Sequence, residues 1–187
     1  MKVLFWIACI GFPILAAAIE SNDKTPEESQ MCTKRVFSRK IQSNPDWGHM
    51  HHYCDGLRFY DRAVRTKNHK SDFRFNISNS LQHFDYVLNH VSKTFNMRPE
   101  VMVMRGRTME LAGDGFEAAQ IYSAAIQLNP TFAMGYAALG NFYTKSGEKE
   151  QAMKIYEEGL RRQPNNRYLR SRYKVLGGES KPEKSKQ

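Results

Sequence analysis

The chain has 187 residues, of which 41% are hydrophobic and 25% are charged. This ordinary globular composition excludes wholesale disorder, and the length suits one compact domain or one solenoid of a few repeats. The net charge of +9 indicates a solvated basic surface or an acidic partner, such as a polyanionic glycan, an anionic membrane surface or an acidic protein.

The N-terminus has the pattern of a secretory signal peptide. Lys2 provides a short positive region, an apolar run from Val3 to Leu15 follows, and Ala16–Ala18 offers small residues for cleavage before Ile19. We therefore expect residues 1–18 to be a signal peptide and the mature protein to be soluble and exported, either periplasmic or secreted. Retention of this segment as a membrane anchor is the alternative, and nucleic acid is not an expected partner.

Two cysteines, Cys32 and Cys54, remain after removal of the signal. Residues 27–42 and 46–66 are predicted helices joined by a turn at Asn44, and the cysteines lie at similar distances from that turn. In an antiparallel hairpin they would sit at similar heights, and in an oxidising compartment such a pair predicts a disulfide. The bridge would close a loop of roughly 20 residues and stabilise the fold by about 3 kcal/mol; two free buried thiols are the alternative.

The rest of the chain also has a helical pattern, in which Gly and Pro separate the segments. The further predicted helices cover residues 73–95, 99–112, 115–128, 132–145, 149–162 and 165–175. Residues 19–26 are expected to be flexible and residues 177–187 disordered, because both are polar. The sequence shows no alternating pattern typical of a strand.

A 34-residue repeat is the strongest signal in the chain. The pairs with this spacing are Gly106 and Gly140, Ala118 and Ala152, Tyr122 and Tyr156, and Pro130 and Pro164. Such a period, with small residues at fixed helix positions, is typical of stacked helix pairs. We expect the small residues where the two helices of a pair approach closely, the aromatic residues between pairs, and the prolines at helix ends.

With these residues, segments 99–132 and 133–166 resemble the tetratricopeptide repeat family. The second segment has the family pattern at Tyr136, Leu139, Gly140, Tyr143, Ala152, Tyr156 and Pro164. The resemblance implies an all-α fold: a short right-handed α-solenoid of antiparallel helix pairs, closed by a capping helix over residues 167–176. Residues 27–98 are expected to form divergent helical hairpins, because Gly56 and Phe59 resemble the first helix of a pair. The second helix of this pair is indicated by Ser80, Phe84 and Val87. The spacing along the chain between the two sets of residues is longer than in the 34-residue repeats.

The resemblance also implies a concave groove that binds other proteins and is lined by the first helix of each pair. Carried onto this sequence, the groove positions are Glu100, Val103, Arg107, Glu110, Leu111, Met134, Ala137, Asn141, Thr144 and Lys145. The candidate binding residues among them are Glu100, Arg107, Glu110, Met134, Asn141 and Lys145. Their mixed charge suits an extended peptide or a helix. The family's clamp for a peptide carboxylate has lysine and asparagine where Val103 and Arg107 stand here, which argues against a C-terminal carboxylate ligand.

A histidine-rich stretch from His49 to Cys54 is the second candidate site. His49 and His52 are three residues apart and so share a helix face. With Cys54 and a fourth ligand such as Asp46, they would make a zinc site. The spacing matches no standard zinc or haem pattern, and a disulfide-bonded Cys54 would not be a ligand. The alternatives are that these residues pack within a helical hairpin or form a patch that binds a partner. Packing is the expected case, so no metal or other cofactor is expected.

The sequence contains no motif of a known enzyme class, such as a phosphate-binding glycine loop or a nucleophile elbow. We therefore expect a non-enzymatic scaffold or assembly factor of an envelope or secretion system, with other proteins as partners. Two alternatives remain open. One is a metal- or haem-handling periplasmic protein that uses the His49–Cys54 stretch. The other is an acidic-glycan-binding module whose candidate residues are Arg161, Arg162, Arg167, Arg170 and Arg172.

Overall fold

The structure, a computed structural model, describes residues 44–178, and this part of the chain is helical without strands. A short 3-10 helix, η2, opens it, and seven α-helices follow. Their bounds are η2 Pro45–His49, α2 Met50–Arg65, α3 Lys70–His90, α4 Arg98–Ala112, α5 Gly115–Leu128, α6 Ala133–Lys145, α7 Lys149–Arg162 and α8 Arg167–Val175. The predicted all-α class is confirmed.

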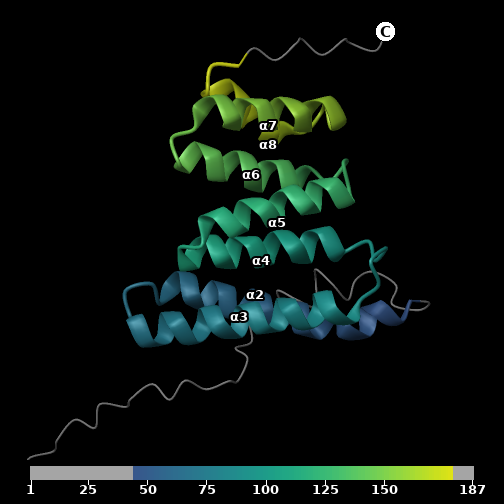
Figure 1. Ribbon diagram of the computed structural model, residues 1–187, viewed down its shortest axis with the longest axis vertical. Helices are drawn as coiled ribbons and strands as arrows, with labels where there is room; N and C mark the ends of the chain where they lie inside the picture. The colour runs from purple at the N-terminus through teal and green to yellow at the C-terminus, as the bar shows by residue number, and fades with distance from the viewer. Residues whose placement is uncertain (1–43, 179–187) are drawn as a thin grey trace, which may run out of the picture.

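The helices stack one after another, with α2 and α3 at one end and α7 and α8 at the other (Figure 1). They pack as the pairs α2–α3, α4–α5 and α6–α7, and α8 packs on α7. The first helices also contact one another, since α4 touches both α2 and α6, and α6 touches α8. The first helices therefore form one layer of a short solenoid and the second helices the other, as expected for stacked helix pairs.

Each helix pair closes around a glycine and an aromatic ring. The glycines lie at the close approach of the two helices, as the repeat predicted, but the aromatic rings expected between pairs pack against the glycine of their own pair. A methyl group on Gly106 would lie 2.6 Å from Cε1 of Tyr122, and a methyl group on Gly140 would be equally obstructed by Tyr156. In the divergent pair, a methyl group on Gly56 would lie 2.6 Å from Cε1 of Phe84. The front hairpin therefore uses the same packing device as the two repeats.

The wider spacing in the front hairpin comes mainly from longer helices. The helices α2 and α3 have 16 and 21 residues, whereas α4 and α5 have 15 and 14. The loop between α2 and α3 covers only residues 66–69. The extra length therefore lies mainly in the helices, above all in α3, and not in the loop.

The prediction of one helix over residues 73–95 is wrong at both ends, because α3 begins at Lys70 and ends at His90. Val91 turns to an extended conformation with φ −85° and ψ 151°. The turn that follows is tied to the start of the described chain: Asp46 accepts hydrogen bonds from Ser92 N at 2.9 Å and from Ser92 Oγ at 2.7 Å. This contact spans 46 residues, so the local pattern gave no sign of it.

Several predicted features lie outside the described residues: the signal peptide, the flexible segment 19–26, the helix at 27–42 and the tail from residue 179. Cys32 lies there too, so its disulfide with Cys54 stays a prediction. Cys54 itself is buried in the core between α2 and α3, with Met50 and Phe84. Within residues 44–178, none of the helices combines the length and the apolar character that crossing a bilayer requires.

Candidate partner-binding groove

A hollow on the described part of the chain lies along the layer of first helices. Its volume is about 540 Å³. We call it the central hollow. It is lined by Tyr60, Lys67, Arg107, Glu110, Leu111, Tyr122, Ala138, Asn141 and Lys145. These residues come from α2 and the loop after it, α4, α5 and α6, so the surface exists only when the pairs are stacked.

A smaller hollow adjoins it toward the C-terminal end of the solenoid. Its volume is about 280 Å³, and we call it the side hollow. It is lined by Arg107, Ala133, Met134, Ala137, Asn166 and Tyr168. Arg107 lines both hollows and so lies on the border between them. We call the two neighbouring hollows together the groove.

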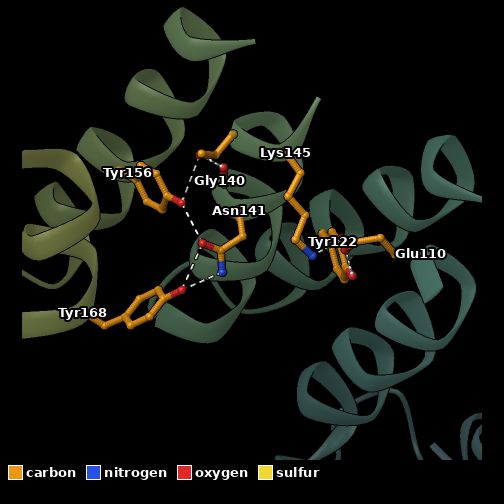
Figure 2. A network of polar contacts seen from close by, with 8 residues as sticks. Glu110, Tyr122, Gly140, Asn141, Lys145, Tyr156 and Tyr168 are labelled. Carbon is orange, nitrogen blue, oxygen red and sulfur yellow. Dashed lines mark hydrogen bonds and ion pairs between the residues drawn. The ribbon is translucent and has the colours of Figure 1, made fainter. Parts of the chain in front are cut away.

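Glu110 organises the wall of the central hollow. Its Oε2 accepts a hydrogen bond from the Tyr122 hydroxyl at 2.9 Å, and its Oε1 accepts one from Lys145 Nζ at 2.6 Å (Figure 2). Three helices therefore meet at one carboxylate. Burial and the neighbouring Glu110 charge raise the pKa of Tyr122, so the phenol stays a hydrogen-bond donor at neutral pH. Since Lys145 balances Glu110, this part of the wall carries little net charge.

Asn141 organises the other part of the groove. Its Oδ1 accepts hydrogen bonds from the Tyr156 hydroxyl at 2.9 Å and from the Tyr168 hydroxyl at 3.0 Å, and its Nδ2 donates to Tyr168 at 2.7 Å (Figure 2). This links α6 to α7 and to the capping helix α8. The amide is thus held in one orientation by phenols from two helices.

Two cations in the central hollow have no carboxylate partner among residues 44–178. Arg107 makes only a long contact of 3.8 Å, from its Nη1 to Met104 Sδ. Lys67 is exposed in the loop after α2. Burial raises the pKa of Tyr60, and the nearby Arg107 charge opposes the rise. The groove therefore carries an uncompensated positive charge next to a neutral phenol.

Comparison with known families decides what kind of solenoid this is. Residues 111–172 match the family model described as tetratricopeptide repeat. This part of the chain is made of tetratricopeptide repeats. Proteins with these repeats (TPRs) are generally non-enzymatic scaffolds for protein–protein interaction.

Among proteins of known sequence, human tetratricopeptide repeat protein 7A is 29% identical over 83 residues, which is 44% of this chain. That match spans only 10% of the human protein. Among solved structures, a thermophilic TPR protein from Thermus thermophilus has a TM-score of 0.56 at 20% identity, covering 76% of this chain and 68% of that one. This likeness shows the TPR fold for most of the chain.

A second solved structure, the first TPR of Spaghetti (RPAP3) bound to an HSP90 peptide, has a TM-score of 0.47 at 15% identity. It covers 65% of this chain and 92% of that one.

The TPR register places most of the expected groove residues together. The central hollow contains Arg107, Glu110, Asn141 and Lys145, and the side hollow contains Met134 beside Arg107. Their role in binding a partner stays a prediction. Of the other expected positions, Leu111 and Ala137 line the hollows, and Thr144 donates to the Gly140 carbonyl at 2.8 Å.

Two expected positions lie away from the groove. Glu100 accepts a hydrogen bond from the Tyr53 hydroxyl at 2.7 Å and lines neither hollow. Val103 is fully buried in the core instead of facing the groove. The sequence reading also missed Tyr60 and Lys67, which line the central hollow from the front hairpin. Tyr60 follows Gly56 by the same four residues by which Glu110 follows Gly106, so the register would have found it.

The histidine stretch lies on the face of the α2–α3 hairpin. Rings from η2, α2 and α3 pack there in tilted or stacked arrangements: His49, His51, His52, His83, Tyr86 and His90. Burial, with His51 and His83 nearby, holds the pKa of His52 below its ordinary value. Within the described residues, no three His, Cys, Asp or Glu side chains come together as a metal-ligand group.

Proposed function

We propose that this chain is a TPR scaffold whose central hollow binds an acidic segment of a partner protein. The observation that carries the proposal is the position of Arg107, which faces both hollows without a carboxylate partner in the described chain. An arginine guanidinium forms paired, charge-assisted hydrogen bonds with a carboxylate, and these are about twice as strong as neutral ones. An Asp or Glu side chain is the group that this position lacks.

The rest of the hollow suits an extended peptide around that carboxylate. Lys67 adds a second positive charge, and Leu111 and Ala138 give apolar contacts. The Tyr122 and Asn141 side chains are already held by hydrogen bonds, so binding would not have to order them. The overall charge of +9 would favour encounter with an acidic partner.

We further propose that the partner belongs to an exported assembly, such as an envelope or secretion system. The support is the signal-peptide pattern of residues 1–18 and the Cys32–Cys54 pair, which would form its disulfide in an oxidising compartment. Mass spectrometry of the protein from its native source tests both points. We expect a mature N-terminus at Ile19 and a Cys32–Cys54 crosslink that reduction removes.

The test of the groove is a selection of short peptides from a random library on the full chain. Selected peptides should be enriched in Asp and Glu, and their binding should weaken as salt rises. We expect Arg107→Glu to weaken binding at least about tenfold, because loss of a charge-assisted contact costs roughly 1.5–3 kcal/mol.

The matched control is Arg74→Glu, which makes the same charge change at an exposed position of α3 outside both hollows. Its binding should match that of the native chain, apart from the small effect of total charge. Peptides without acidic residues, or equal binding by both variants, would show that Arg107 does not recognise the partner.

A further inference from the structure

The chain contains an acidic segment of its own, ahead of the residues that the structure describes. Residues 20–28 have a net charge of −3, from four carboxylates and one lysine. The carboxylates are Glu20, Asp23, Glu27 and Glu28. The rest of the chain is strongly basic, and residues 29–43 hold four cations and no carboxylate. Residues 20–28 therefore have the chemistry of an acidic ligand, and they are covalently attached to the groove.

The central hollow has the complementary charge. Arg107 and Lys67 line it without a carboxylate partner among residues 44–178. Lys145 differs from them, because its Nζ is balanced by Glu110 at 2.6 Å. Two uncompensated cations in one hollow match two neighbouring carboxylates in an extended peptide, and such complementarity favours encounter and fixes the register of binding.

The chain is long enough to bring the segment to the hollow. Glu28 precedes Asn44, the first described residue, by 16 positions. A stretch of that length spans up to about 50 Å when extended. From Asn44, η2 and α2 lead to Tyr60 in the wall of the hollow over at most about 30 Å, at rises of about 2.0 and 1.5 Å per residue. The predicted Cys32–Cys54 bridge would shorten the tether, because Glu28 lies four residues before Cys32 and Tyr60 six residues after Cys54.

We propose that residues 20–28 bind in the central hollow of their own chain, with Glu27 and Glu28 at Arg107 and Lys67, and so regulate access of the partner. This inference rests on the proposed function, because the segment occupies the site assigned to the partner's acidic residues. A short tether gives an attached ligand an effective concentration on the order of millimolar. A partner must therefore displace the segment, and its apparent affinity is reduced by the fraction of chains whose hollow is occupied.

The first test is calorimetric titration with a synthetic peptide of residues 20–28. The full chain is compared with a neutral-segment variant, which carries Glu20→Gln, Asp23→Asn, Glu27→Gln and Glu28→Gln. The peptide should bind this variant, and it should bind the native chain at least about fivefold more weakly, because the attached segment competes for the same hollow. Adding Arg107→Glu to the neutral-segment variant should weaken binding at least about tenfold, because a charge-assisted contact is lost.

The matched control makes the same charge change at exposed positions outside both hollows. It carries Asp114→Asn, Glu148→Gln, Glu150→Gln and Glu157→Gln. This control should bind the peptide as weakly as the native chain does, because its own segment is intact. Circular dichroism establishes that each variant is folded.

A second measurement locates the attached segment in the native chain. A carbodiimide joins a lysine amine to a carboxylate that contacts it, and mass spectrometry then identifies the two residues. We expect Lys67 to be joined to Glu27 or Glu28. Lys154, which is exposed on α7 and lines neither hollow, should not be joined to the segment.

The inference is overturned if the peptide does not bind the neutral-segment variant, if it binds the native chain equally well, or if Lys67 is not joined to the segment. It is also overturned if the control variant gains the same affinity. Should acidic library peptides bind the neutral-segment variant through Arg107 when the peptide of residues 20–28 does not, only this inference fails and the proposed function stands. A library that yields no acidic peptides even on this variant overturns the proposed function itself.

Discussion

Gly106 shows how a single residue sets the spacing between two TPR helices. Its hydrogen faces the Tyr122 ring, which is fully buried, and the Tyr122 hydroxyl in turn holds Glu110 in the wall of the central hollow. A side chain at this position would move the ring and, through it, the carboxylate. The glycine therefore matters both for packing and for the shape of the groove.

We expect Gly106→Ala to destabilise the chain. Overpacking lowers the free energy of unfolding by about 1–3 kcal/mol. Replacing a helical glycine by alanine raises it by at most about 1 kcal/mol, because alanine favours the helix. The closest contact would be 2.6 Å, with a fully buried ring, so overpacking should outweigh the gain. Urea unfolding followed by circular dichroism measures the change.

Gly48→Ala is the control, because a methyl group there has no atom within 4 Å. Its stability should be unchanged or slightly higher. If Gly106→Ala proved as stable as Gly48→Ala, the close packing of α4 on α5 would not be what requires a glycine.

At the scale of elements, the link between η2 and the turn after α3 joins the two ends of the front hairpin. Asp46 is buried, and its carboxylate accepts two hydrogen bonds from Ser92. Arg98 donates from its Nη1 to the carbonyls of Leu88 and Val91, which would otherwise be open at the end of α3. Together these contacts end one helix and begin the next.

The stability of this link should depend on pH. Hydrogen bonds from Ser92, which outweigh the effect of burial, hold the pKa of Asp46 below its ordinary value of 3.8. The carboxylate therefore contributes its full stabilisation above about pH 4 and loses it as the pH falls through the lower pKa of the folded state. Asp46→Asn should lower the free energy of unfolding at pH 7 by about 1.5–3 kcal/mol, and the deficit should shrink toward pH 2.

Denaturant unfolding of both proteins between pH 7 and pH 2 measures this difference. Asp114→Asn is the control, because Asp114 is exposed and its side chain makes no capping hydrogen bond at the start of α5. A deficit that is constant over the whole pH range would mean that ionisation of Asp46 is not what stabilises the turn.

The elements within the 34-residue repeat were predictable because their signals are local. Gly, Pro and the aromatic residues mark the ends and inner faces of α4 to α7, and the same register located Arg107, Glu110, Asn141 and Lys145. The end of α3 was not predictable, because it depends on the contact of Ser92 with Asp46. The pairing of His52 with His83 was missed for the same reason, since periodicity within one helix carries no information on its partner in the next.

At the scale of the whole molecule, stability is distributed along the stack. Three buried clusters follow one another, one between α2, α3 and the start of α4, one around Val103 and Tyr122, and one around Tyr136, Tyr156 and Leu169. In such a solenoid each unit is stabilised by its neighbours, and an end unit needs a cap. In α8 the fully buried Leu169 provides the central contact of this cap, and Tyr173 and Leu176 pack against the same cluster.

We expect Leu169→Ala to cost about 2–5 kcal/mol and to act mainly at its own end of the molecule. Hydrogen exchange should become faster in α6, α7 and α8 and change little in α2 and α3, because repeat interfaces couple nearest neighbours most strongly. Val175→Ala is the control, since Val175 is 75% exposed. Equally faster exchange in all helices would show that the chain unfolds as one cooperative unit.

The position of Arg107 on the border of the two hollows has a thermodynamic consequence. One guanidinium cannot be fully paired with a carboxylate in each hollow at the same time. Two separate acidic ligands, one in each hollow, would therefore weaken each other's binding. A single chain that crosses the border would need only one acidic residue there and could place its flanking residues in both hollows. If the groove binds an acidic segment as proposed, it should therefore discriminate by the spacing of charge along its ligand, and not only by the amount of charge.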